Sequence, residues 1–173
     1  EQQNIYIPIH SEDKDFFFFF FEIIKDQYET IIENRYIDNV ENVISNLYEN
    51  RYISGLIAEC QYELSIRQAE AFELVSNPLK YIQNNGYIEN LNGKGNHIYE
   101  PKEISFELEQ KLLNNQEELI SKSTYYYDLQ KYDISSHDFR FTSARDKFEE
   151  KMKNGISEKE AKLQISSELN HKR

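Results

Sequence analysis

Apolar residues recur at three- and four-residue steps through the first half of the chain, as on the buried face of an amphipathic helix. The pattern runs from Asp15 to about Leu74, and polar breaks near Asn34 and Asn50 divide it into three predicted helices. The recurring apolar positions are Ile23, Ile24, Tyr28, Ile31, Ile32, Val40, Val43, Ile44, Leu47, Ile53, Leu56, Ile57 and Cys60.

The texture changes between Asn77 and Pro101, where short apolar runs alternate with turn-forming residues. The runs are 79–82, 87–91 and 97–99, and the turns are Asn84-Asn85-Gly86 and Asn92-Gly93-Lys94-Gly95. Asn-Gly pairs between such runs favour tight hairpins. We therefore predict a small three-stranded antiparallel sheet, with Lys94 at the tip of its second hairpin.

Helical periodicity returns in the last third of the chain. Helices are predicted from about 105 to 122 and from about 124 to 132, and two more follow. Ser136 is the predicted N-cap of the first of these two, and Gly155 its predicted end. The three-residue spacing of His137 and Arg140 would place both side chains on one face of that helix.

The last helix is predicted to begin at Ser157, because Glu160 three residues later completes a capping-box pattern. Its apolar stripe is Ala161, Ile165 and Leu169. The stripe ends beside His171, which would therefore lie at a helix end. Together these patterns predict an α+β, mainly helical fold.

The length of 173 residues suits one domain, which we place at 16–173 after an extended or disordered arm at 1–15. The single cysteine, Cys60, excludes an internal disulfide, and no signal peptide is recognisable, so a cytoplasmic location is expected. The apolar run from Phe16 to Phe21 is far too short for a membrane span, so no membrane partner is expected. We expect it to be partly buried.

The formal net charge of -11 argues against a protein that coats nucleic acid by charge alone. The charge is uneven, however. Residues 137–173 hold nine Lys and Arg against seven Asp and Glu, a net +2, which leaves -13 for residues 1–136.

Four short segments recur in the order and at the intervals of a known family. They are Ser65-Ile66-Arg67-Gln68-Ala69-Glu70-Ala71, Gly93-Lys94-Gly95, His137-Asp138-Phe139-Arg140 and Leu169-Asn170-His171. Over about residues 38–173 the chain resembles the catalytic domain of tyrosine recombinases, the phage-integrase and Xer family of DNA-strand-exchange enzymes. The resemblance implies a recombinase-like helical bundle around the small sheet, and double-stranded DNA as partner.

The residues that the resemblance assigns to catalysis are Arg67, Lys94, His137, Arg140 and His171. Attack on a phosphodiester builds negative charge on its non-bridging oxygens, which the two guanidinium groups would bind through forked hydrogen bonds. The resemblance implies that the histidines hydrogen-bond the phosphate or accept a proton, and that the lysine protonates the leaving 5′-oxygen. Glu70 is expected to hold an arginine in place. No metal and no cofactor are expected.

The nucleophile of the family is a tyrosine about nine residues beyond the last histidine, and it forms a 3′-phosphotyrosyl link to DNA. This chain ends two residues after His171, so we assign no nucleophile within it. The cluster Tyr125-Tyr126-Tyr127 is assigned to packing. We therefore expect a truncated, inactive catalytic domain that is monomeric alone and would form a homo-oligomer on DNA. Asn170, Phe141 and Ser65 also depart from the residues common in the family.

Two other interpretations remain open. One is a catalytically inactive descendant of the family that regulates by binding DNA or a partner recombinase. The other is an acidic helical interaction protein, in which Arg67, Lys94, His137, Arg140 and His171 would be scattered over the fold.

Overall fold

The computed structural model describes residues 35–83 and 86–169. The helices in this part are α2 (Val40–Asn50), α3 (Tyr52–Glu63), α4 (Gln68–Ser76), α5 (Pro78–Tyr81), α6 (Phe106–Leu113), α7 (Lys122–Gln130), α8 (Ser136–Lys153) and α9 (Glu158–Glu168); the strands are β1 (Ile82–Gln83), β2 (Tyr87–Ile88) and β3 (Lys102–Glu103). The described chain is thus mainly helical with a small antiparallel sheet, as predicted.

The described residues 36–169 belong to one compact unit. The predicted arm at 1–15, the Phe16 to Phe21 run and His171 all lie outside the described residues. No helix in the described part is long and apolar enough to cross a membrane.

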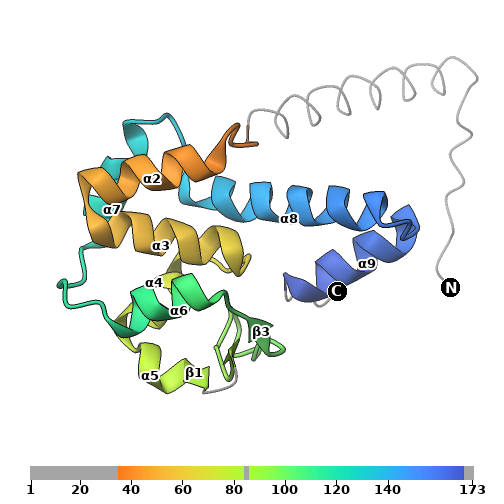
Figure 1. The fold of residues 1–173 in the computed structure, drawn as a ribbon, viewed down its shortest axis with the longest axis horizontal. Helices are drawn as coiled ribbons and strands as arrows, with labels where there is room; N and C mark the ends of the chain where they lie inside the picture. Colours follow the sequence, from red (N-terminus) through yellow and green to blue (C-terminus); the bar gives the residue numbers. More distant parts are fainter. Residues whose placement is uncertain (1–34, 84–85, 170–173) are drawn as a thin grey trace, which may run out of the picture. The chain divides into compact units, whose positions relative to one another are not determined.

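Helix α3 is the centre of the core, because apolar residues cover most of its surface. Leu56 and Ile57 are fully buried, and the helix packs against α2, α4, α6 and α8. Gly55 permits the close approach of Tyr48, whose ring would lie 2.4 Å from a Cβ at this position. Helix α8 runs along this core, and α9 folds back against α8 (Figure 1).

The sheet is three-stranded and antiparallel as predicted, but two of its strands differ. Residues 79–81 lie in α5 instead of a strand, because Pro78 at the first helical position favours a helical turn. The third strand is β3, and not 97–99. The latter residues pair with 91–93 in a separate hairpin, in which the Tyr99 N–H donates to the Leu91 carbonyl at 2.9 Å. Lys94 does lie in the turn of this hairpin.

The helix boundaries bring three further corrections. The helix predicted to continue to Leu74 is interrupted after Glu63, where Ser65 adopts a left-handed conformation with φ 55°. The helix predicted for 105–122 ends at Leu113, and α7 begins where a break was expected, because Ser121 accepts a hydrogen bond from the Thr124 N–H.

The third correction concerns the start of α8. Ser135 and not Ser136 is its N-cap, because the Asp138 carboxylate accepts a hydrogen bond from the Ser135 N–H at 2.7 Å and completes a capping box. The predicted end at Gly155 is confirmed, since this residue follows the helix with φ 82°. Ser157 caps α9 as predicted.

Candidate functional site

Arg67 is held at the start of α4 by a small polar network. Its backbone N–H and its guanidinium both donate to the Glu70 carboxylate, the latter at 3.3 Å. The Tyr99 hydroxyl donates to Glu70 at 2.8 Å and accepts from Arg67 Nη1 at 3.2 Å. The three side chains form a closed triangle, in which Glu70 is buried and Arg67 is partly exposed. The guanidinium is therefore oriented before any ligand binds.

Arg140 approaches the same network from α8. Its side chain is only 6% exposed, and Nη2 donates to the Leu169 carbonyl at the end of α9. Burial lowers the pKa of Arg140, and the nearby charge of Arg67 lowers it further. Nε of Arg140 is buried and has no hydrogen-bond partner among the described residues. The charges of Arg67, Tyr99 and Glu70 thus act on Arg140, although the two arginines come from different helices.

Two lysines extend this positive region. Lys102 on β3 donates to the Glu168 carbonyl at 2.9 Å, and its Nζ lies 5.0 Å from the centre of the Tyr99 ring. Burial, and then the charge of Lys147, lowers the pKa of Lys102 to about 8. Lys147 on α8 donates to the Glu63 carbonyl and to Ser65 Oγ, both at 2.9 Å. Burial lowers its pKa as well.

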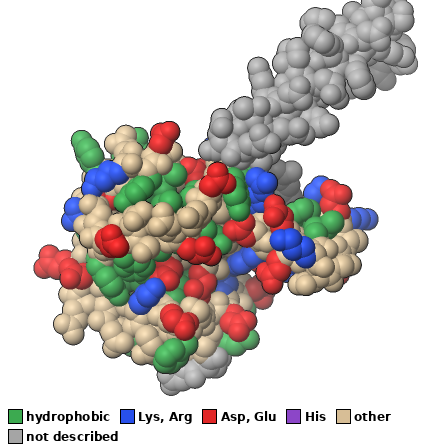
Figure 2. All heavy atoms as spheres, turned by 45° about the horizontal axis from the view of Figure 1, so that its top comes forward, with side chains coloured by type: hydrophobic (Ala, Val, Ile, Leu, Met, Phe, Trp, Pro, Cys, Tyr) green, Lys and Arg blue, Asp and Glu red, His purple; other side chains and the backbone are tan. Residues whose placement is uncertain are grey.

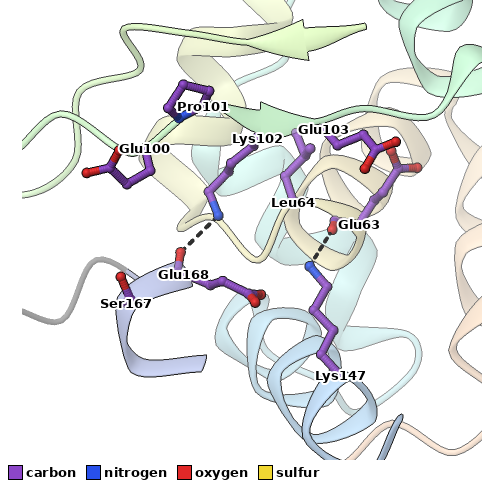
Figure 3. A pocket seen from close by; sticks show the side chains of 9 residues that line it. All are labelled: Glu63, Leu64, Glu100, Pro101, Lys102, Glu103, Lys147, Ser167 and Glu168. Atoms are coloured by element: carbon purple, nitrogen blue, oxygen red, sulfur yellow. Dashed lines mark hydrogen bonds between the residues drawn. The ribbon is translucent and has the colours of Figure 1, made fainter. Parts of the chain in front are cut away.

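Lys102 and Lys147 line a cavity of about 320 Å³. Figure 3 shows Lys102 reaching from β3 to the end of α9, and Lys147 reaching from α8 to the end of α3. The cavity wall also carries the acidic residues Glu63, Glu100, Glu103 and Glu168. Because Lys147 donates to the Glu63 carbonyl and to Ser65 Oγ, it supports the loop that leads from α3 to Arg67.

The two guanidinium groups are suited to binding an anion. They lie with the two ammonium groups among the carboxylates of Glu63, Glu70, Glu100, Glu103 and Glu168, so the charge of this region is mixed and an anion would be bound by the paired guanidiniums. On the face drawn in Figure 2, acidic side chains are scattered among hydrophobic and basic ones. Paired guanidiniums in a partly dehydrated site bind phosphate oxygens strongly and with defined geometry. In the described part of the chain, no group of acidic, His or Cys side chains could hold a metal ion.

The structure does not bring every predicted site residue into this network. Lys94 is exposed in its hairpin turn, and His137 is exposed in the first turn of α8 while Arg140 on the same helix is buried. Within the described residues, no hydrogen bond or ion pair joins either side chain to the arginines. His171 cannot be placed, because it lies outside the described part.

Sequence reasoning missed Tyr99, Lys102 and Lys147. Tyr99 had a usable signal, since it lies on the returning arm of the hairpin that carries Lys94. The two lysines had none, because lysine is mostly exposed and its burial here depends on segments distant in the sequence.

Comparisons with models of protein families, with curated proteins and with solved structures found no match to this chain.

Proposed function

We propose that this chain is a catalytic domain, or part of one, of a site-specific DNA recombinase that acts through a 3′-phosphotyrosyl intermediate. The observation that carries the proposal is that Arg67 hydrogen-bonds Glu70 and Tyr99, and that the charges of these three residues also act on Arg140. Each arginine belongs to a separate motif of the recombinase pattern. Their electrostatic proximity favours the proposal over an unrelated interaction protein, in which the motif residues would be scattered.

The proposed chemistry follows from the charge of the reacting phosphodiester. In-line attack by a tyrosine hydroxyl concentrates negative charge on the two non-bridging oxygens, and preorganised guanidinium groups stabilise that charge. The exposed position of Lys94 in a hairpin turn leaves its ammonium able to approach a leaving 5′-oxygen on bound DNA. His137 is exposed in the first turn of α8 and is accessible to the same phosphate backbone.

Binding to double-stranded DNA tests the proposal directly. The variant Arg67→Gln removes the guanidinium while the adjacent Glu70–Tyr99 hydrogen bond can persist. Measured by fluorescence anisotropy with a labelled duplex of about 30 base pairs at low salt, its affinity should fall about tenfold, which corresponds to ~1.4 kcal/mol. The slope of log affinity against log salt should decrease by about one, as for a lost phosphate contact.

Arg145→Gln is the matched control. Arg145 is a half-buried arginine of α8 that pairs with Glu149 and lies over the Tyr36 ring, so its loss changes the net charge equally without touching the site. Equal affinities and salt slopes for the two variants would contradict the proposal, because the effect of Arg67 would then be one of net charge alone.

A further inference from the structure

The C-terminal end of α9 is held by two cations that come from different elements. Lys102 on β3 binds the Glu168 carbonyl, and Arg140 on α8 binds the Leu169 carbonyl. Carbonyls in the last turn of a helix have no partner within the helix and carry its partial negative charge. Positive side chains are therefore suitable partners, and here they connect α9 to the arginine site.

We propose that Lys102 is a positioning residue of the phosphate site, which fixes the end of α9 against Arg140 and so sets the position of the Arg140 guanidinium. The inference rests on the proposed function, because it assigns Lys102 to the site where that function places the DNA phosphate. Lys102 is none of the residues named by the sequence motifs.

The contacts of Lys102 reach both arginines. Its ammonium lies on the ring of Tyr99, whose hydroxyl contacts Arg67. The carbonyl that it binds belongs to Glu168, next to the Leu169 carbonyl bound by Arg140. Loss of Lys102 would therefore loosen α9 and leave Arg140 less fixed. The buried Nε of Arg140 has no partner in the described structure, so its N–H is available to donate a hydrogen bond to a phosphate oxygen.

The charge of Lys102 is sensitive to its surroundings. The charged groups that face it are Lys147 and Arg140 from α8, Glu168 from α9, Glu70 from α4, Glu63 from α3, and Glu100 and Glu103 beside it on the chain. Burial is the main reason that its pKa falls to about 8. The attraction between Lys102 and the end of α9 is thus complete well below pH 8 and is lost as the pH rises above it.

The test uses Lys102→Met, which keeps the length of the side chain but removes the donor, and Lys102→Arg, which keeps a positive donor at all pH values of interest. Lys162→Met is the control, because Lys162 is an exposed lysine of α9 that pairs with Glu158 on the same helix. Circular dichroism melts first establish that each variant is folded. Amide hydrogen exchange of the last turn of α9 is then measured without DNA, and duplex affinity is measured from pH 6.5 to 9.5 at constant ionic strength.

Exchange in the last turn of α9 should be about fivefold faster in Lys102→Met than in the wild type, and near the wild-type rate in Lys102→Arg and Lys162→Met. Relative to Lys102→Arg, the wild type should lose about fivefold in DNA affinity as the pH passes 8, and Lys102→Met should show no such step. This step in DNA affinity follows the loss of the positive charge of Lys102. A purely structural role of the side chain would produce no step at this pH.

Two results would overturn the inference. Unchanged exchange in Lys102→Met means that Lys102 does not hold α9. If Lys102→Met shows faster exchange but binds DNA with wild-type affinity and with the wild-type dependence on pH, the contact serves stability alone. Failure of the proposed function is recognised separately, by wild-type affinity in Arg67→Gln, and the exchange rates do not depend on that result.

Discussion

Tyr99 is the residue on which the candidate site depends most at the level of single side chains. Its hydroxyl accepts from Arg67 and donates to Glu70, and its ring lies beneath the ammonium of Lys102. Burial, and then the adjacent carboxylate, raises the pKa of Tyr99 to about 12, so its hydroxyl stays protonated at neutral pH. It can therefore donate and accept at the same time.

Tyr99→Phe should separate the hydroxyl from the ring. The buried carboxylate of Glu70 loses a donor, so the free energy of unfolding should fall by about 1–3 kcal/mol in urea denaturation. DNA affinity should fall as well, because Arg67 loses one of its two fixed partners. Tyr127→Phe, at an exposed tyrosine of α7, is the control and should change neither. If the two variants have equal free energies of unfolding, the hydroxyl of Tyr99 does not stabilise the network.

How far the site could be predicted differs from residue to residue. Arg67 and Arg140 could be named from their motifs, because the spacing of such motifs is visible in the sequence. The burial of Arg140 against α9 could not be predicted from its motif, because it depends on how a later helix folds back. Lys102 follows Pro101 without any periodic pattern, and its hydrogen bond to the Glu168 carbonyl depends on where α9 lies in the fold.

Among the elements, those with end signals in the sequence were predicted best. Gly155 after α8 and Ser157 before α9 mark their boundaries through local conformation, which the sequence contains. The short elements were predicted poorly. A single turn such as α5 and a two-residue strand such as β3 have too few residues for a period, so no periodic pattern marks them in the sequence.

The contact of α2 with α3 depends on a glycine. Gly55→Ala adds a Cβ that would meet the Tyr48 ring at 2.4 Å, and this ring is held by a hydrogen bond to Glu59 and by the ammonium of Lys111. Alanine favours a helix over glycine by up to about 1 kcal/mol, whereas overpacking costs about 1–3 kcal/mol. We expect net destabilisation in urea denaturation.

The sign of the effect provides the control. In a Tyr48→Ala background the space beside Gly55 is open, so the same Gly55→Ala change should stabilise the protein through helix propensity. Destabilisation of similar size in both backgrounds would show that Tyr48 is not the cause.

For the molecule as a whole, stability against acid should depend on Asp128, which joins three helices. Its buried carboxylate on α7 accepts from Asn50 at the end of α2, at 3.0 Å, and from Arg51 and Ser54 at the start of α3, at 2.9 and 2.7 Å. Burial alone would raise the pKa of Asp128, but the hydrogen bonds from Ser54 and Arg51 outweigh it and lower the pKa. The folded state therefore favours the ionised form.

A lowered pKa in the folded state stabilises the protein above the unfolded pKa of about 3.9, and this contribution is lost as the pH falls through the folded value. At pH 7, Asp128→Asn should lower the free energy of unfolding by about 1–3 kcal/mol, and the difference from the wild type should shrink as the pH falls below about 4. Urea denaturation at several pH values measures both. Glu158→Gln, at a fully exposed carboxylate that also has a lowered pKa, should show no comparable difference, because solvent screens its pair with Lys162. If the Asp128→Asn difference is the same at pH 7 and at pH 3, the carboxylate stabilises the fold through its shape and hydrogen bonds, and the charge that joins α2, α3 and α7 contributes nothing.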